Sequence, residues 1–208
     1  PTHKTSSAAS DVYKRQAGQY KYAFDYKELP SVYLKQFGIK IDEYVKHHHS
    51  HMAGGYYTAP FEDAMTLTID AIGEMETMTV WDNEKMIARQ QYPLSLGLLY
   101  SAVTQRIGLK PNEEEYITMG MAAYGKPNLT EHMKTFLLKR NNHKGIGYYC
   151  DWAKDYDLAA SVQQVYENEL KRIVKKHCKK INLVISGGCA LNCVANSNIT
   201  VSYTHLRA

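Results

Sequence analysis

The chain has 208 residues, 44% of them hydrophobic and 22% charged, which is the composition of a globular protein with one ordinary domain. Its formal net charge of +4 includes +2 from residues 1–16 and +1 from residues 201–208, so residues 17–200 carry only +1. A nearly neutral body does not favour a nucleic-acid partner. No apolar run approaches the roughly 20 residues that cross a bilayer, so no membrane segment is expected. The four Cys include no CxxC pair, which indicates reduced thiols and a cytoplasmic protein.

The two ends of the chain differ in character from the segments beside them. Residues 1–16 and 201–208 have neither helical nor strand periodicity. Both resemble translated sequencing-adapter read-through, so we expect two non-native tails around a domain formed by residues 17–200. The alternative is that they are ordinary disordered tails.

The N-terminal half predicts helices followed by a β-meander. A short amphipathic helix is expected over residues 31–37, and a second within residues 52–61, where it ends in a Pro-marked loop. Three strand-like runs follow, over residues 64–70, 75–81 and 86–92.

The C-terminal half predicts helices and one further strand. Four helices are expected, over residues 95–107, 115–124, 129–140 and 157–178. The apolar run 181–186 is typical of a buried strand. Gly187-Gly188 ends this strand, and a helix is expected to begin immediately after it. The order of elements indicates one α/β domain, or part of one.

Two histidines have the spacing of a metal site. His47 and His51 are four residues apart, so on a helix both imidazoles project from one face and can bind one cation. Fe, Zn and Mn are all compatible with imidazole and oxygen ligands. The alternative is a solvated, His-rich turn, and the spacing alone leaves both interpretations open.

Acidic residues occur at two further places. Asp70 ends the run TLTID before a turn, where a carboxylate can hold a cation-bound phosphate. Asp and Gly also occupy hairpin turns for backbone reasons alone, so a purely structural interpretation stays open. The glutamate run 113–115 is typical of a solvated face.

The segment VISGGCALNCVAN predicts a strand, a Gly-Gly turn and a helix start. Backbone N–H groups in such a turn can approach a phosphate or an adenosine closely. Asn192 and Asn196 are four residues apart and are expected to share a helical face. The alternative is a tight turn without a ligand. Neither GxGxxG nor GxxxxGK[ST] is present, so a Rossmann site or a P-loop is not supported.

Four segments, in this order, resemble the motifs of O-carbamoyltransferases that act on antibiotics and nodulation factors. HHHSHMAGGYY resembles their HHxxHA motif, and LTIDAIGE resembles their DGxGE motif. The stretch from SLGLLYSAV to MGMAAYGKP resembles their central signature, and DLAASVQQVYENEL with LVISGGCALNCVAN resembles their last helix and nucleotide turn. The resemblance covers about residues 30–200.

This resemblance implies a partial α/β domain of the actin/hsp70/sugar-kinase type (ASKHA), incomplete at both ends and similar to the tRNA threonylcarbamoyl-transfer protein. It also implies a reaction. A C-terminal YrdC-like domain, expected to lie outside this chain, makes carbamoyl-adenylate from carbamoyl phosphate and ATP. The larger domain then passes the carbamoyl group to a hydroxyl of a small-molecule or glycan acceptor. The chain alone is therefore expected to be inactive.

The resemblance also assigns roles to residues. His47 and His51 match the ligands of a divalent metal, whose further carboxylate ligand is expected from outside this chain. His48 matches a residue that contacts the carbamoyl group or assists proton transfer, and Asp70 matches an acid near the phosphates. The nucleotide turn is matched by Gly187, Gly188, Asn192 and Asn196.

Two positions depart from the family pattern. Ala71 stands where Gly is usual, and Ile117 stands where Lys is common, which puts a phosphate contact at position 117 in doubt. Three other functions compete. A hydrogenase-maturation carbamoyltransferase shares the HHxxH pattern, a sugar kinase of the same superfamily lacks the His pair, and a metal- or nucleotide-binding module without turnover would need no acceptor.

Overall fold

The computed structural model describes residues 34–40, 42–43, 45–138 and 146–202. The expected tail at residues 1–16 and most of the one at 201–208 lie outside the described residues. The first two residues of the second tail continue the backbone of the last helix. Of the first expected helix, residues 31–33 lie outside the described residues, Leu34 and Lys35 are helical, and a turn follows in which the N–H of Phe37 donates to the carbonyl of Leu34 at 3.0 Å.

The centre of the domain is a mixed four-stranded sheet with the order β3-β2-β1-β4. The strands β1 (Met65–Gly73), β2 (Glu76–Asp82) and β3 (Lys85–Gln91) form an antiparallel meander. The strand β4 (Leu183–Ser186) runs parallel to β1. The meander and the α/β class are confirmed. The run 181–186 does form a strand, over Leu183–Ser186, but its expected burial was wrong, because β4 is the last strand of the described sheet and is only half-buried.

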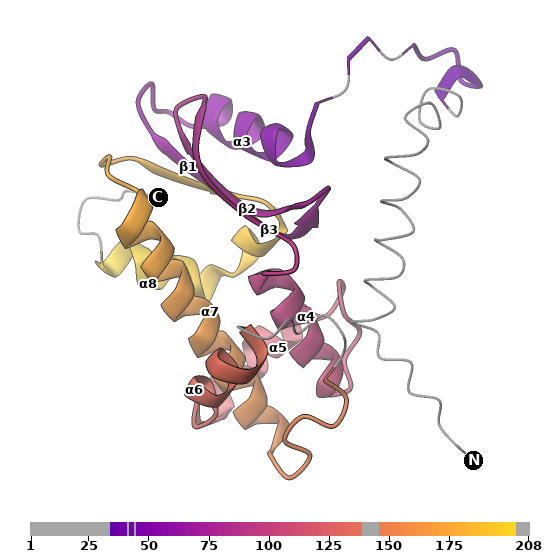
Figure 1. The fold of residues 1–208 in the computed structure, drawn as a ribbon, viewed down its shortest axis with the longest axis vertical. Helices are drawn as coiled ribbons and strands as arrows, with labels where there is room; N and C mark the ends of the chain where they lie inside the picture. The colour runs from indigo at the N-terminus through magenta and orange to yellow at the C-terminus, as the bar shows by residue number, and fades with distance from the viewer. Residues whose placement is uncertain (1–33, 41, 44, 139–145, 203–208) are drawn as a thin grey trace.

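The two faces of the sheet differ in polarity because successive strand side chains alternate. Met65, Leu67 and Ile69 of β1 belong to the hydrophobic core, together with side chains of α4 (Leu96–Arg106) and α7 (Asp155–His177). The other face carries buried Thr side chains and is covered by α3 (His47–Thr58). Figure 1 shows α3 on one side of the sheet and α4 and α7 on the other.

The helix ends follow local signals. Ser95 caps α4, since its Oγ accepts a hydrogen bond from the N–H of Leu98 at 3.0 Å. Gly108 follows the C-cap of α4 and ends the helix with φ +85°, a conformation that glycine adopts without a steric penalty. Asp155 and Asp157 lie in the first turn of α7 and basic residues in its last, which suits the helix dipole.

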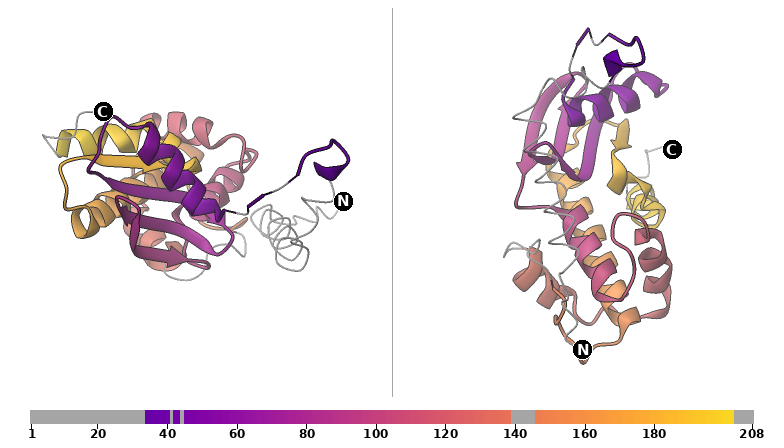
Figure 2. Two further views of the ribbon diagram at one scale, coloured as in Figure 1. Left: turned by 90° about the horizontal axis from the view of Figure 1, so that it is seen from above. Right: turned by 90° about the vertical axis from the view of Figure 1, so that its right-hand side faces the viewer.

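The remaining helices are shorter or less regular than predicted. The helix α5 (Glu115–Met121) continues into a 3-10 helix over Ala122–Tyr124, and α6 (Thr130–Met133) continues as a π-helix over Lys134–Leu138. These helices and α3 lie at opposite ends of the molecule (Figure 1; Figure 2, right). No helix in the described ranges has both the length and the apolar character needed to cross a membrane.

The segment after β4 differs from the prediction. A 3-10 helix over Gly188–Leu191 comes first, and α8 (Cys193–Ser202) begins only after Asn192. The side-chain Oδ1 of Asn192 accepts a hydrogen bond from the N–H of Ala195 at 3.0 Å and so caps α8. The expected helical segment therefore begins directly after the Gly-Gly turn as a 3-10 helix, and only the start of the α-helix was wrong, because its cap is Asn192.

Candidate metal centre and adjoining pocket

Three metal-ligand side chains converge where the first turn of α3 meets the end of β1. The Nε2 atoms of His47 and His51 lie 2.8 and 3.2 Å from Oδ2 of Asp70. One ligand atom from each residue lies within 4.8 Å of the others. Both imidazoles project from one face of α3, as their spacing predicts.

Two glycines allow α3 to approach the sheet this closely. A Cβ atom at Gly73 would lie 2.2 Å from Cδ2 of His47 and 2.7 Å from Cδ2 of His48. On the helix side, a Cβ at Gly55 would lie 3.0 Å from Cγ1 of Val184 in β4. The hydroxyl of Ser186 also donates to the carbonyl of His51 at 2.8 Å. The position of the His pair therefore depends on close backbone packing against both β1 and β4.

The electrostatics of the cluster favour an ion pair. The hydrogen bond with Asp70 raises the pKa of His47 above its usual value, although partial burial opposes this. Burial by itself raises the pKa of Asp70, but hydrogen bonds from His47 and the Ala71 N–H outweigh it, so the pKa lies below its usual value. A cation would take the place of the shared proton.

The donor set fits a first-row metal. Two imidazole nitrogens and one carboxylate oxygen suit Fe, Zn or Mn, and three protein ligands leave positions open for a substrate, as in catalytic sites. A carboxylate ligand was expected from outside this chain. In the structure Asp70, which the sequence assigned to the phosphates, reaches both imidazoles and can fill that place.

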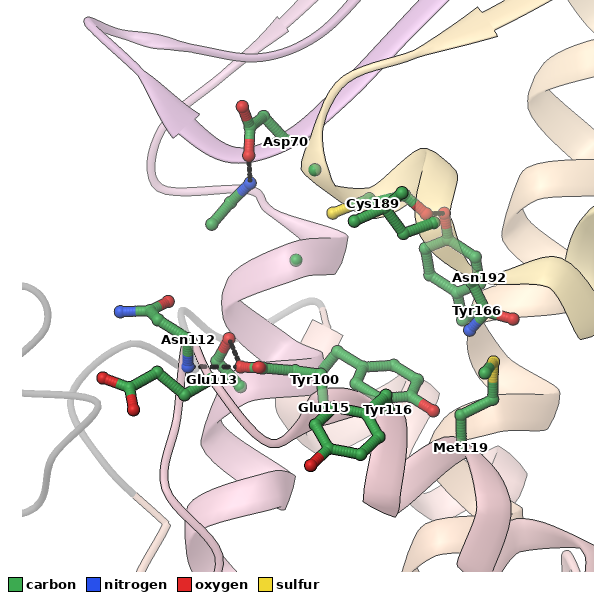
Figure 3. Close-up of a pocket in the computed structure, with 15 residues that line it drawn as sticks. Asp70, Tyr100, Asn112, Glu113, Glu115, Tyr116, Met119, Tyr166, Cys189 and Asn192 are labelled. Atoms are coloured by element: carbon green, nitrogen blue, oxygen red, sulfur yellow. Dashed lines mark hydrogen bonds between the residues drawn. The ribbon is translucent and has the colours of Figure 1, made fainter.

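A pocket of about 360 Å³ opens beside this cluster and shares Asp70 with it. Figure 3 shows that its side chains come from the end of β1, from α4, α5 and α7, from the loop before α5, and from the turn after β4. Tyr116, Met119 and Leu191 give it aromatic and apolar walls, while Glu113 and Glu115 add carboxylates. Among the described residues, no Lys or Arg lines it.

Comparison with known proteins identifies the family. The family model described as carbamoyltransferase N-terminus matches residues 9–154 and 149–205. The chain belongs to this family. It is 31% identical over 191 residues to the protein sll1178 of Synechocystis sp., covering 74% of this chain and 31% of that protein.

Two relatives of lower identity also match most of this chain. The nodulation protein NolNO of Sinorhizobium fredii is 25% identical over 201 residues, covering 82% of this chain and 29% of that protein. The protein MJ1058 of Methanocaldococcus jannaschii is 25% identical over 213 residues, covering 83% of this chain and 34% of that protein. The chain thus spans about a third of the length of the curated relatives that it matches.

The predicted nucleotide turn of this carbamoyltransferase domain divides into two parts. Gly188 and Asn192 line the pocket. Gly187 lies behind it with φ +97°, and a Cβ there would lie 2.3 Å from the carbonyl oxygen of Ile69. Asn196 also lies behind the turn, where its Nδ2 donates to the carbonyl of Ala190 at 2.7 Å. The structure therefore brings two of these residues to the pocket and uses the other two to shape the turn.

His48 lies away from the pocket, in the layer between α3 and the sheet. It is 3% exposed, and its Nδ1 is 3.1 Å from the hydroxyl oxygen of Thr79, which also accepts from Nε1 of Trp81. Burial lowers the pKa of His48 to about 4, so its ring is neutral at pH 7. Its Nε2 has no hydrogen-bond partner in the part of the chain that the structure describes.

Sequence reasoning missed the role of the glutamate run. Glu113 does behave as a solvated residue paired with Lys110. Glu115, in contrast, is half-buried at the pocket, where its Oε1 accepts from the hydroxyl of Ser101 and the N–H of Asn112, both at 2.6 Å. Ile117, one of the departures, is half-buried in α5 and does not line the pocket.

Proposed function

We propose that this chain forms the metal- and nucleotide-binding part of an ATP-dependent carbamoyltransferase. The main support for the proposal is that Asp70 belongs both to the histidine cluster and to the pocket wall. A cation held by this cluster would therefore lie at the edge of the pocket. Family membership supports the same chemistry.

The histidine cluster would hold a divalent cation through Nε2 of His47, Nε2 of His51 and a carboxylate oxygen of Asp70. A cation there supplies polarisation of a phosphoryl or carbonyl oxygen. The chain contributes fixed geometry: both imidazoles come from one helix turn, and their approach to Asp70 is set by packing against β1.

The pocket would hold the nucleoside end of ATP or carbamoyl-adenylate. Its carboxylates, and the lack of lining cations in the described part of the chain, make it unsuitable for phosphates but suitable for an uncharged group with hydroxyls. Glu113 and Glu115 would accept from ribose hydroxyls, and the side chains of Tyr116 and Met119 would contact the base. The phosphate end would then lie toward Asp70 and the cation.

The further parts of this function follow the family resemblance. Carbamoyl phosphate and ATP would be the substrates, a hydroxyl-bearing molecule the acceptor, and a YrdC-like domain the source of carbamoyl-adenylate. The antiparallel meander joined to one parallel strand supports a partial ASKHA domain. The position of His48 supports a role in fixing α3 rather than direct contact with the carbamoyl group.

The test is a calorimetric titration of the chain with ATP, with and without Mn²⁺. We expect Mn²⁺ to strengthen ATP binding in the wild-type chain, because the cation joins the phosphates to the cluster. His47→Ala and Asp70→Asn should remove this effect. His49→Ala is the matched control, since His49 is exposed on the same helix and stacks on Trp81 outside the cluster.

An ATP affinity that changes neither on addition of Mn²⁺ nor in His47→Ala would contradict the proposal. Transfer itself is followed as AMP release from ATP and carbamoyl phosphate, with a YrdC-type domain and a hydroxyl acceptor supplied separately. Binding without transfer under these conditions would favour a metal- or nucleotide-binding module. The chain alone is expected to give no turnover.

A further inference from the structure

The helix α3, which carries both histidine ligands, has few stabilising features of its own. Of its 12 residues only His48 and Met52 are buried, whereas α4, with 11 residues, buries nine. No side chain caps its N-terminus, and its first turn contains no acidic residue. A helix of this length is marginal by itself in water, so α3 depends on its contacts with the sheet. Figure 1 shows it as the outer layer on its side of the sheet.

The sheet face under α3 carries a row of three hydroxyl side chains. Thr68 of β1 is in register with Thr79 of β2 on one side and with Ser186 of β4 on the other. Ser186 donates to the carbonyl of His51 at 2.8 Å. Oγ1 of Thr79 lies 3.1 Å from Nδ1 of His48. Thr68, between them, is fully buried, and its hydroxyl has no hydrogen-bond partner among the described residues.

The unpartnered polar atoms weaken the docking of α3. When α3 lies on the sheet, the Thr68 hydroxyl and Nε2 of His48 are shielded from water and gain no hydrogen bond in the described part of the chain. Each such group makes docking less favourable by roughly fivefold or more. In the opposite direction, Asp70 pairs with His47 and His51 and joins the first turn of α3 to β1.

We propose that α3 is a cation-dependent clamp. Without a cation it opens from the sheet while the rest of the domain stays folded, and a cation held by His47, His51 and Asp70 closes it. Only the closed arrangement brings two ligands from α3 and one from β1 together, so the cation binds the closed state more tightly and stabilises it. Because Asp70 also lines the pocket, closure of α3 fixes part of the pocket wall at the same time. This inference rests on the proposed function, in which the cluster holds a cation.

The test is amide hydrogen exchange of the 208-residue chain, with and without Mn²⁺. In the metal-free chain, amides of α3 should exchange roughly tenfold or more faster than those of β1 and β2, because α3 opens by itself. Mn²⁺ at about 100 times its dissociation constant should slow the exchange of α3 by up to about a hundredfold. The same Mn²⁺ concentration should give little protection in His51→Ala, which lacks one ligand.

Thr68→Val is the most specific variant, because it removes the unpartnered hydroxyl and keeps the shape of the side chain. We expect it to slow the exchange of α3 in the metal-free chain by roughly fivefold or more, although no metal ligand changes. Thr77→Val is the matched control. Thr77 is also buried in the sheet, but its hydroxyl has a partner, the carbonyl of Leu94 at 2.5 Å, so its removal should give no such protection.

The outcomes separate the clamp from the metal centre itself. Mn²⁺ binding seen by calorimetry without slower exchange in α3 would overturn the clamp and leave the proposed metal centre intact. Amides of α3 that exchange as slowly as those of β1 and β2 in the metal-free chain would also overturn it, as would wild-type exchange in Thr68→Val. A chain that binds no Mn²⁺ would overturn the proposed function as well.

A second variant covers the case in which Thr68→Val does not fold. Ser186→Ala loses the hydrogen bond to the carbonyl of His51 and should speed the exchange of α3 in the metal-free chain. Exchange in α3 that is as slow as in the wild type would then count against the clamp.

Discussion

Gly73→Ala is expected to damage the metal centre although residue 73 bears no ligand atom. The added Cβ would lie 2.2 Å from Cδ2 and 2.7 Å from Cγ of His47, and 2.7 Å from Cδ2 of His48. Ordinary carbon contacts begin at about 3.4 Å, so the His47 ring must move by roughly 1 Å. Gly73 is not among the glycines with positive φ, so the effect is steric rather than backbone strain.

The size of the effect follows from the two rings that must move. Overpacking of this kind costs about 1–3 kcal/mol of folding stability. Metal affinity should fall by more than the stability does, because ligand distances are tolerated only within about 0.2 Å. We expect at least a tenfold weaker Mn²⁺ affinity in Gly73→Ala, with the fold retained.

The measurements are Mn²⁺ titration calorimetry and urea unfolding of the metal-free chain. Gly54→Ala is the matched control, since a Cβ at Gly54 meets no atom within 4 Å and Ala favours the α3 helix by about 1 kcal/mol. A Gly73→Ala chain that unfolds and binds Mn²⁺ as the wild type does would refute the packing argument.

Four further outcomes are expected. His47→Ala and His51→Ala should each lower the metal content measured by elemental analysis, and unchanged stoichiometry in both would reject the assignment. Metal affinity should fall as pH falls through the raised pKa of His47, because only the neutral imidazole binds; an affinity that is constant between pH 8 and 6 would contradict this. The pKa of His48 falls from 6.5 to about 4 on folding, so the folded state should lose about 3 kcal/mol of stability as pH drops from above 6.5 to below 4. In His48→Asn, the unfolding free energy measured with denaturant should lack that part of the pH dependence. A variant whose unfolding free energy falls with pH as steeply as that of the wild type would contradict this role of His48. Gly188→Val should weaken ATP binding in calorimetry with the fold retained, since even its Cβ would lie 3.0 Å from Oδ1 of Asp70, and normal affinity would refute this role.

The secondary structure was predictable where the local sequence determines the type of an element or its ends. Alternating polarity predicts β1 and β2, because one face of each packs on the core and the other lies toward α3, whereas β3 is mostly exposed. Ser95 and Gly108 mark the ends of α4 by their own hydrogen bond and backbone angle. The start of α8 also has a local signal, the Asn192 cap, but the Gly-Gly turn suggested an earlier start. The exposure of β4 has no local signal, since it depends on which strands lie beside it.

The candidate site was predictable only in its local part. The spacing of His47 and His51 gives a shared helix face without any knowledge of the fold. The arrival of Asp70 beside them depends on packing between α3 and β1, which are separated by a loop. Glu115 could not be distinguished from Glu113 by composition, because both belong to one charge run. Only the tertiary position of α5 decides which of the two carboxylates is half-buried at the pocket.

Asp70 explains why the departure at Ala71 is compatible with the proposed site. Oδ2 of Asp70 faces both imidazoles, whereas Oδ1 accepts from the Ala71 N–H at 2.8 Å and lies near Gly188. Both polar contacts of residue 71 are made by its backbone, since its carbonyl accepts from the hydroxyl of Ser95 at 2.6 Å. A side chain in place of the usual Gly removes neither hydrogen bond. What this corner requires is a glycine at 97, where a Cβ would lie 2.6 Å from the Cα of Ala71. The metal cluster, the pocket and the start of α4 are thus joined through the backbone of one residue, and its side chain is free to differ.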